Sequence, residues 1–248
     1  MREDLFSTYS LKIIDYKRVI IQYKSVIDEE LLQHIRKLVT YLTDHYDRSD
    51  KKVEVFHTYT EIAIQFLNTP LSIKKEVAKI DEILESGVLA NKVSDEIESA
   101  NFKIPVCYQQ PFAKDVAEVA KMNQLSEEKV IELHHQPIYR VYFIGFLPGF
   151  PYLGGLNQQI CAPRKEKARS KISKGDVGIA GCQTGIYSVD SPGGWQIIGN
   201  TPIDLVQLND KVNTVLKSGD TISFYPIPKA KHEELKNSNK KVDLTAEI

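Results

Sequence analysis

The chain has 248 residues, 42% of them hydrophobic, and a formal net charge of -1 at pH 7. This length allows one large or two ordinary domains, and the near-neutral charge excludes a global field that would attract nucleic acid or an anionic membrane. Met1 is followed by charged residues rather than by a basic and apolar leader, and no apolar run is long enough to span a bilayer. We therefore expect a cytoplasmic protein that binds neither nucleic acid nor a membrane.

The first predicted elements are a hairpin and a helix. Short β-branched or aromatic runs at residues 11–14 and 19–23 are separated by residues 15–18, which predicts two paired strands. Asp28 can cap a helix in which apolar residues recur at helical spacing over residues 31–42. One face of that helix is therefore expected to belong to a core.

Two more strands and a second helix are predicted to follow. Apolar and polar residues alternate at residues 53–55 and 62–66, as they do in half-buried strands. Ser72 is a candidate cap for a helix over residues 73–84, and Gly87 is a candidate stop. The order β-β-α-β-β-α predicts a small two-layer α/β sandwich.

A domain boundary is predicted in residues 86–100, which are rich in Ser, Asn, Asp and Glu and show little periodicity. It separates an N-terminal α/β domain at residues 1–90 from a second domain at residues 101–228. In the second domain, short apolar runs punctuated by glycine and proline follow two short helices, which favours an all-β barrel. Residues 229–248 carry many charges and few large apolar groups, so they are predicted to form a disordered tail.

The three cysteines, Cys107, Cys161 and Cys182, are odd in number and widely spaced. They make neither a disulfide framework nor a CxxC metal half-site, so reduced thiols are expected. The sequence has no zinc-ligand spacing, no phosphate-binding loop and no dinucleotide-binding motif. We therefore expect no metal site, and a nucleotide would have to bind at a non-standard or shared site.

Glycine is concentrated in three stretches. Ten of the thirteen glycines lie in residues 145–155, 178–187 and 191–202. Glycine is costly to order, so this density indicates tight turns or backbone that closely approaches a neighbouring strand or a ligand. Barrel corners and a ligand-binding surface are both open interpretations.

These stretches resemble the cyclophilin-like β-barrel domain of the 5-oxoprolinase B-subunit family, which overlaps with allophanate hydrolase subunit 1 and with sporulation histidine-kinase inhibitors. The resemblance extends through residues 104–108, 115–120, 125–134 and 219–227, and so covers essentially all of residues 101–228. It implies an α+β fold, with a small N-terminal α/β two-layer sandwich plus a C-terminal cyclophilin-like β-barrel.

The resemblance also implies a function. The chain would be one subunit, inactive alone, of a multi-subunit ATP-dependent 5-oxoprolinase that opens 5-oxoproline to L-glutamate. Its partners would be a larger carboxyltransferase-like subunit and a third, hydrolytic subunit, and ATP with Mg²⁺ would act at the level of the complex. Two alternatives stay open: an inhibitor that binds a sensor histidine kinase and blocks its autophosphorylation, or a subunit of an allophanate or urea-amidolyase-like amide hydrolase.

A basic segment follows the first glycine stretch, and only Glu166 opposes its charge. Its cations are Arg164, Lys165, Lys167, Arg169, Lys171 and Lys174. Such a cluster suits a carboxylate or a phosphoryl group, and arginine suits bidentate contact; a solvated basic loop is the alternative. Arg164 and Arg169 fall on motif positions of the resembled family, so they are the preferred substrate-binding candidates.

Polar and aromatic residues of the motifs complete the predicted substrate-binding set. They are His134, Gln183, Tyr187, Ser191 and Trp195. A buried amide or hydroxyl could instead bond to a turn backbone, and the indole could fill the barrel core. His134 ends a predicted helix, whose C-terminus would raise the proton affinity of the imidazole and suit an anion contact; a structural helix-end histidine is the alternative. No catalytic residue is identified.

One short run and one single residue depart from the pattern of the resembled family, and a further position varies within it. Residues 109–112 replace a Gly-Gly-acidic-Phe run, and Asn200 stands where arginine is common. Both changes could alter a contact to the ligand or to a partner subunit. Cys182 stands where another small residue is common, and we interpret it as a small filler.

Overall fold

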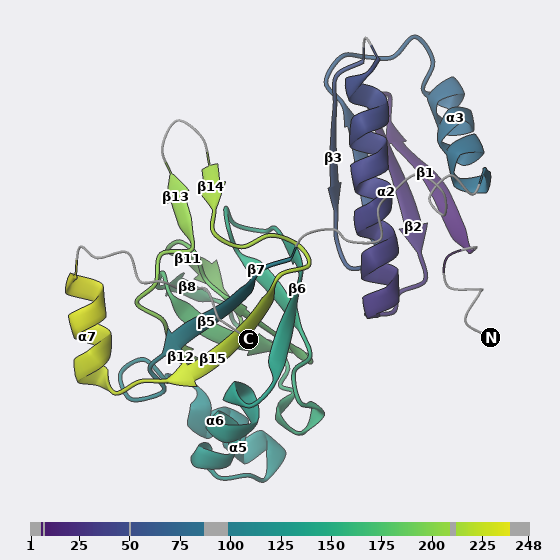
Figure 1. Cartoon of the computed structure of the whole chain (residues 1–248). Coiled ribbons are helices and arrows are strands. Elements are labelled where there is room, and N and C mark those ends of the chain that lie inside the picture. Colours follow the sequence, from purple (N-terminus) through teal and green to yellow (C-terminus); the bar gives the residue numbers. More distant parts are fainter. Residues whose placement is uncertain (1–5, 7, 50, 87–98, 209–211, 239–248) are drawn as a thin grey trace. The chain divides into compact units, whose positions relative to one another are not determined.

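The computed structural model forms two compact units, each with its own sheet and its own hydrophobic core (Figure 1). The units comprise Met1–Glu98 and Ser99–Ile248. The structure describes residues 6, 8–49, 51–86, 99–208 and 212–238. Among the helices of these residues, none is both long and apolar enough to cross a membrane.

The first unit is a four-stranded antiparallel sheet in the order β1-β2-β4-β3, packed against two helices. Its elements are β1 (Tyr9–Asp15), β2 (Arg18–Tyr23), α2 (Glu29–Asp47), β3 (Val53–His57), β4 (Glu61–Phe66) and α3 (Ile73–Glu85). The side chains of Asp28 and Ser72 accept hydrogen bonds from the backbone N–H groups of Leu31 and Lys75, so both predicted caps are confirmed. The order β-β-α-β-β-α is confirmed as well, whereas Gly87 lies outside the described residues.

One face of this sheet forms the core of the first unit. Val19 and Ile21 of β2 and Ile62 and Ile64 of β4 are buried, and the residues between them are more exposed. They pack against apolar residues of both helices. This arrangement follows from the sequence, because a period of two places alternate strand residues on one face and a helical period makes a matching stripe.

The second unit is built on a seven-stranded sheet in the order β12-β9-β10-β7-β6-β15-β5. These strands are β5 (Asn101–Val106), β6 (Ile138–Ile144), β7 (Pro151–Gly154), β9 (Asp176–Ala180), β10 (Gln183–Ile186), β12 (Gln196–Asn200) and β15 (Thr221–Pro226). Cys107, which directly follows the edge strand β5, and Asn200, the last residue of the other edge strand β12, exchange two backbone hydrogen bonds of 2.8 and 3.0 Å. The sheet is therefore curled into a half-barrel, and the chain has the mixed α and β structure that was predicted. The cyclophilin-like label stays a prediction.

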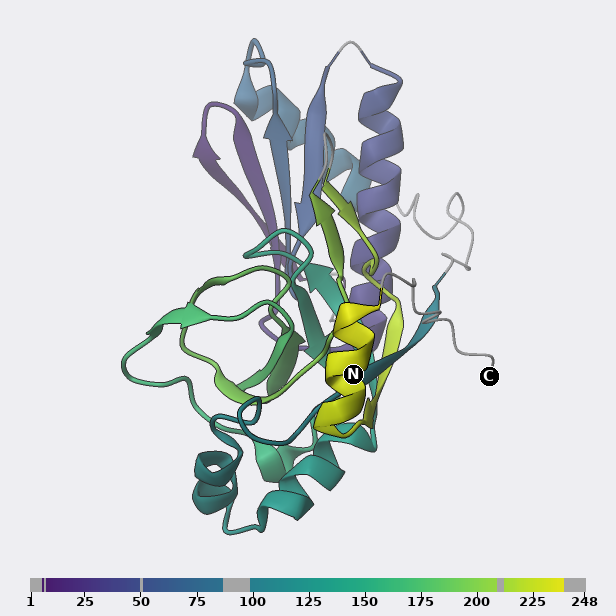
Figure 2. The same cartoon turned by 90° about the vertical axis from the view of Figure 1, so that its left-hand side faces the viewer.

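Shorter elements surround the curled sheet. They are α5 (Val116–Asn123), α6 (Glu127–His135), the 3-10 turn η1 (Gln158–Ile160), β8 (Arg169–Ile172), β11 (Ser191–Gly193), β13 (Val206–Leu208), β14 (Val212–Thr214) and α7 (Lys229–Asn237). Strand β8 pairs with β11, and β13 pairs with β14. Figures 1 and 2 show α5 and α6 together at one end of the curled sheet, with the β13–β14 ribbon projecting at the other.

Helix α7 corrects the prediction of a disordered tail from residue 229. The backbone N–H of Lys229 donates to the side-chain oxygen of Gln109 (3.0 Å), and His232 is buried with its ring 4.2 Å from the ring of Phe112. Composition could not reveal this helix, because among its described side chains only that of His232 is buried. Residues 239–248 lie outside the described part of the chain.

A disulfide bond joins Cys161 to Cys182, so the prediction of reduced thiols is wrong for these two residues. The interpretation of Cys182 as a small filler is corrected with it. Ala162 and Gly181 pair through two backbone hydrogen bonds, which brings two cysteines that are 21 residues apart in sequence to a Cα separation of 4.5 Å. Cys107 is free and buried. Sequence spacing alone cannot show which two loops will pair.

Candidate functional site

Most cations of the basic segment are already paired within the chain. Lys165 contacts Asp115 and Glu118, Arg169 contacts Asp115, Lys171 contacts Asp190, and Lys174 contacts Asp204, at N–O distances of 2.5–3.1 Å. The pairs of Lys171 and Lys174 are exposed, and such surface ion pairs add little stability. For these two lysines, the structure agrees with the solvated-loop alternative.

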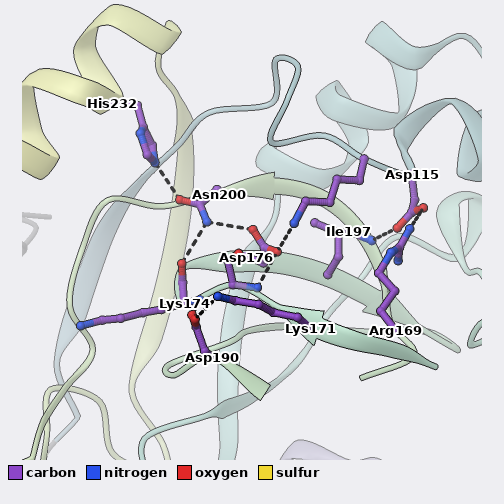
Figure 3. Close-up of polar contacts among 11 residues, drawn as sticks. Asp115, Arg169, Lys171, Lys174, Asp176, Asp190, Ile197, Asn200 and His232 are labelled. Atoms are coloured by element: carbon purple, nitrogen blue, oxygen red, sulfur yellow. Dashed lines mark hydrogen bonds and ion pairs between the residues drawn. The ribbon is translucent and has the colours of Figure 1, made fainter. Parts of the chain in front are cut away.

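Asp115 organises the buried side of the segment and precedes α5. Its side chain is 3% exposed, and one carboxylate oxygen accepts hydrogen bonds from Arg169 (2.5 Å) and Lys165 (3.1 Å). The other oxygen accepts from the backbone N–H of Ile197 in β12 (2.6 Å), as Figure 3 shows. Burial opposes ionisation, but hydrogen bonds from Arg169, Ile197 and Lys165 together lower the pKa of Asp115 below its ordinary value.

Arg169 keeps one open contact point despite this pairing. Its second guanidinium nitrogen, Nη1, is buried and has no hydrogen-bond partner among the described residues. The same holds for the side-chain oxygen of Gln196, whose amide nitrogen donates to the carbonyl of Pro163 (3.1 Å). Buried polar atoms normally find a partner, so this donor and this acceptor are candidates for contact with a bound ligand.

Arg164 differs from its neighbours because it is exposed and, within the residues described, pairs with no carboxylate. Its guanidinium carbon lies 5.9 Å from the centre of the Trp195 ring. This distance is typical of a cation–π contact, which orients the guanidinium group without neutralising its charge. Arg164 is therefore the predicted site residue that is best placed to receive an anion.

An aromatic cluster lies beneath Arg164. Trp195 is 4% exposed, and its ring centre lies 5.3 Å from that of Phe150 and 5.8 Å from that of Tyr152. Tyr187 is buried and packs edge-on against Phe150 at 5.2 Å. Burial raises the pKa of Tyr187 to about 12, so its phenol stays neutral at physiological pH. Trp195 and Tyr187 thus belong to a core cluster, which was the alternative interpretation for the indole.

Gln183 and Ser191 are the remaining predicted substrate-binding residues, and each begins a short strand. Gln183 begins β10 and is half-buried, and Ser191 begins β11 and donates to the carbonyl of Pro192 (3.1 Å). In the described part of the chain, neither side chain hydrogen-bonds to another member of the predicted set. Their role in substrate binding stays a prediction.

His134 lies in the barrel core, and the expectation of a raised proton affinity is wrong. It is 0% exposed, and its two ring nitrogens lie 2.8 Å from the hydroxyl of Tyr108 and 2.9 Å from that of Thr184. Thr184 donates to the carbonyl of Gly178, so the Thr184 oxygen accepts from His134 Nε2–H. Burial, assisted by the charge of His135, lowers the pKa of His134 to about 3, because desolvation outweighs the helix dipole.

We predict that His134 does not titrate near neutral pH. Its folded-state pKa of about 3 lies below the ordinary value of 6.5, so the unfolded chain binds more protons between these values. The stability that the neutral imidazole provides is therefore complete above pH 6.5 and declines as pH falls towards 3. Ring-proton NMR of the whole chain should show no midpoint for His134 between pH 5 and 8. A midpoint near 6.5 would contradict the buried, neutral assignment.

The sequence did not predict a hydrogen-bond network that links His232, Asn200 and Asp176. His232 of α7 lies 2.7 Å from the side-chain oxygen of Asn200, and the amide nitrogen of Asn200 donates to Asp176 (2.9 Å) and to the carbonyl of Lys174 (3.1 Å), as Figure 3 shows. Asp176 also pairs with Lys114 at 2.7 Å. Among the described residues, no three His, Cys, Asp or Glu side chains are grouped so that they could hold a metal ion.

Two of the departures from the family pattern indicate where α7 is bound to the barrel. Asn200 supplies the acceptor for His232, while Gln109, which stands where the family has glycine, accepts from the backbone N–H of Lys229 at the start of α7. Two departures that lie far apart in sequence thus contact the same helix. Two positions that both depart from a family pattern are thus candidates for contact with the same element.

Comparison with known proteins identifies the family. The family model described as carboxyltransferase domain, subdomain C and D, matches residues 9–216. The 5-oxoprolinase B-subunit of Bacillus subtilis is 40% identical over 202 residues, which are 81% of this chain and 78% of the relative. The protein of the same name from Haemophilus influenzae is 47% identical over 133 residues, which are 54% of this chain and 62% of the relative. Urea amidolyase of Lachancea kluyveri is 26% identical over 83% of this chain and 11% of the relative.

Solved structures share the fold. Urea carboxylase of Kluyveromyces lactis matches with a TM-score of 0.76 at 18% identity, over 91% of this chain and 22% of that chain. The crystal structure of TTHA0988 matches with a TM-score of 0.70 at 27% identity, over 85% of this chain and 40% of that chain. The resemblance predicted from the glycine-rich stretches is therefore confirmed. The chain belongs to the 5-oxoprolinase B-subunit family, which carries the carboxyltransferase domain, subdomains C and D.

Proposed function

We propose that this chain is the B-subunit of a multi-subunit, ATP-dependent 5-oxoprolinase that opens 5-oxoproline to L-glutamate. The observation that carries the proposal is the 40% identity to the Bacillus subtilis protein over 81% of this chain. In this proposal the chain is inactive alone. It works with a larger carboxyltransferase-like subunit and a third, hydrolytic subunit, and the complex is cytoplasmic.

The chemistry of the reaction calls for a free cation. A lactam carbonyl is a poor electrophile, and transfer of a phosphoryl group to its oxygen turns that oxygen into a leaving group. The substrate carboxylate and the phosphoryl group are both anions, and an arginine can bind either of them through two N–H groups. Arg164 meets this need because it is exposed and lies against Trp195.

We assign ATP and Mg²⁺ to the assembled complex rather than to this chain alone. The sequence lacks a phosphate-binding loop and a dinucleotide-binding motif. A nucleotide would therefore be held at a non-standard site or at one shared with the larger subunit, and Arg164 would contribute to the anion-binding part of that site.

The test is 5-oxoproline-dependent ATP hydrolysis by the purified subunits, combined and separate. Activity that appears only in the mixture would support the shared enzyme. A stable complex that hydrolyses no ATP in the presence of 5-oxoproline would overturn the assignment of this substrate.

Replacement of Arg164 by alanine should lower kcat/KM of the assembled complex roughly 10- to 100-fold, because hydrogen bonds to charged groups contribute about 1.5–3 kcal/mol. Steady-state kinetics and analytical gel filtration would measure activity and assembly. Lys167→Ala is the matched control, since Lys167 is an exposed cation of the same segment and has no ion-pair partner among the described residues. Equal kinetics for Arg164→Ala and Lys167→Ala would remove Arg164 from the site.

A second candidate is a subunit of an amide hydrolase that acts on allophanate or a similar substrate. It is favoured by the match to urea amidolyase over 83% of this chain. The same assay with allophanate in place of 5-oxoproline separates the two candidates, because only the correct amide should stimulate turnover. The role of a sensor histidine-kinase inhibitor stays a prediction.

A further inference from the structure

The register of two loops sets Cys161 opposite Cys182. Ala162 and Gly181 exchange both of their backbone hydrogen bonds, at 3.0 and 2.7 Å, so they form one hydrogen-bonded pair of an antiparallel ladder. The two cysteines occupy the next opposite positions, at a Cα separation of 4.5 Å. This is the spacing of a non-hydrogen-bonded pair, in which side chains approach most closely. The backbone therefore brings the sulfur atoms together without any rearrangement.

The pair is also accessible from solvent. Cys182 is exposed and Cys161 is half-buried, whereas Cys107 is fully buried. Thiol–disulfide exchange requires that a small molecule reach one of the sulfur atoms. Of the three cysteines, Cys182 is thus the one whose thiolate can attack a dissolved disulfide first, and Cys161 is in place to resolve the mixed disulfide.

The bond lies between two parts of the candidate site. Arg164 follows Cys161 by three residues, and Gln183 directly follows Cys182. Beyond Arg164, the segment is held by the hydrogen bond from Lys165 N–H to the carbonyl of Gly194 (2.7 Å). Before Arg164, the segment is fixed by the isolated backbone pairing of Ala162 with Gly181 and by the disulfide. Two side-chain amides add hydrogen bonds there, from Asn123 to the carbonyl of Cys161 (3.2 Å) and from Gln196 to the carbonyl of Pro163 (3.1 Å).

We propose that Cys161 and Cys182 form a reversible thiol–disulfide switch that sets the order of the segment carrying Arg164. Ala162 is buried, but Gly181 and Cys182 in the opposite loop are exposed, and the backbone pairing of Gly181 with Ala162 stands outside any longer ladder. Local stability depends on how many contacts must break together, so loss of the covalent bond lowers the stability of this pairing. The disulfide makes that hold covalent and keeps Arg164 over Trp195. Reduction leaves the segment free to open and uncovers the indole; that this also weakens substrate binding rests on the proposed function.

The exchange needs a low-molecular-weight disulfide as the oxidant. The Cys182 thiolate attacks one sulfur of the disulfide, forms a mixed disulfide and releases one thiolate. The Cys161 thiolate then attacks the Cys182 sulfur, forms the internal bond and releases the second thiol. In total, two protein thiols lose two electrons and two protons, and the small disulfide is reduced to two thiols. An excess of a small dithiol reverses the reaction.

The experiment uses the full chain without partners, equilibrated with either glutathione disulfide or dithiothreitol and freed of small thiols. Thiol titration of the unfolded protein should find one reactive thiol after oxidation and three after reduction, because the chain has three cysteines and one bond. Trp195 is the only tryptophan, so acrylamide quenching of its fluorescence reports on its cover. Quenching should increase when the protein is reduced.

Cys182→Ser is the control for the quenching measurement. This variant should behave like the reduced wild type in both glutathione disulfide and dithiothreitol. Three reactive thiols after oxidation would overturn the switch because no bond forms. Equal quenching of the oxidised and reduced wild type would overturn the inference that the disulfide determines the order of the segment that carries Arg164. Neither measurement involves 5-oxoproline, so failure of the proposed reaction would leave both results standing.

Discussion

Replacement of Gly175 by alanine is expected to lower the free energy of unfolding of the second unit by about 3 kcal/mol or more. Gly175 has a φ of +84°, in the left-handed region that disfavours side chains. A Cβ atom at this position would also collide with the carbonyl oxygen of Thr201 and lie 3.0 Å from the side-chain oxygen of Asn200. Urea unfolding followed by Trp195 fluorescence measures the loss.

The clash is strongly destabilising because hydrogen bonds on both sides of Gly175 keep its backbone from moving away. The N–H of Gly175 donates to the carbonyl of Tyr187 (2.7 Å), and its carbonyl accepts from the N–H of Thr201 (2.9 Å). Gly181→Ala is the matched control, since Gly181 has a φ of +58° but open space around its Cβ position. That variant should lose only about 1–2 kcal/mol from backbone strain. Equal losses at the two glycines would contradict the steric argument.

The first unit could be predicted almost completely because its signals are local. Asp28 and Ser72 precede amphipathic stretches, and alternating strand residues such as Ile62 and Ile64 mark the buried face directly. Each of these signals acts within a few residues. The second unit offers fewer such signals. Its strand β15 pairs in parallel with β5, about 120 residues earlier in the chain, and no local pattern specifies that neighbour.

The same difference between local and long-range signals applies to the candidate site. Residue type and motif position made Arg164 and Arg169 equally good candidates for substrate binding. Only the fold distinguishes them, because Asp115 neutralises Arg169 from a helix start 54 residues away, while Arg164 is left over an aromatic ring. His134 shows the converse, since its helix-end position suggested an anion contact, but the surrounding core determines its chemistry. Pairing and burial are long-range properties, which residue types alone do not encode.

Replacement of Asp115 by alanine should destabilise the second unit by about 3–5 kcal/mol, because removal of one partner from a buried ion pair leaves the other charge uncompensated. Here the loss affects Arg169, Lys165 and the backbone N–H of Ile197 at once. The variant should therefore unfold at a much lower urea concentration than the wild type. Asp190→Ala is the matched control. Asp190 is exposed and accepts from Lys171 (2.9 Å) and from the backbone N–H of Lys174 (2.8 Å), so that change should cost only about 1–2 kcal/mol.

The pH dependence of the same pair of variants tests the electrostatic origin of the effect. The folded-state pKa of Asp115 lies below its ordinary value, so its contribution is complete above the unfolded-state pKa of about 3.9 and is lost as pH falls through the lower folded-state value. The stability difference between wild type and Asp115→Ala should thus be constant from pH 6 to 8 and shrink in acid. A difference that persists unchanged at pH values well below 3.9 would mean that Asp115 acts through packing and not through its charge.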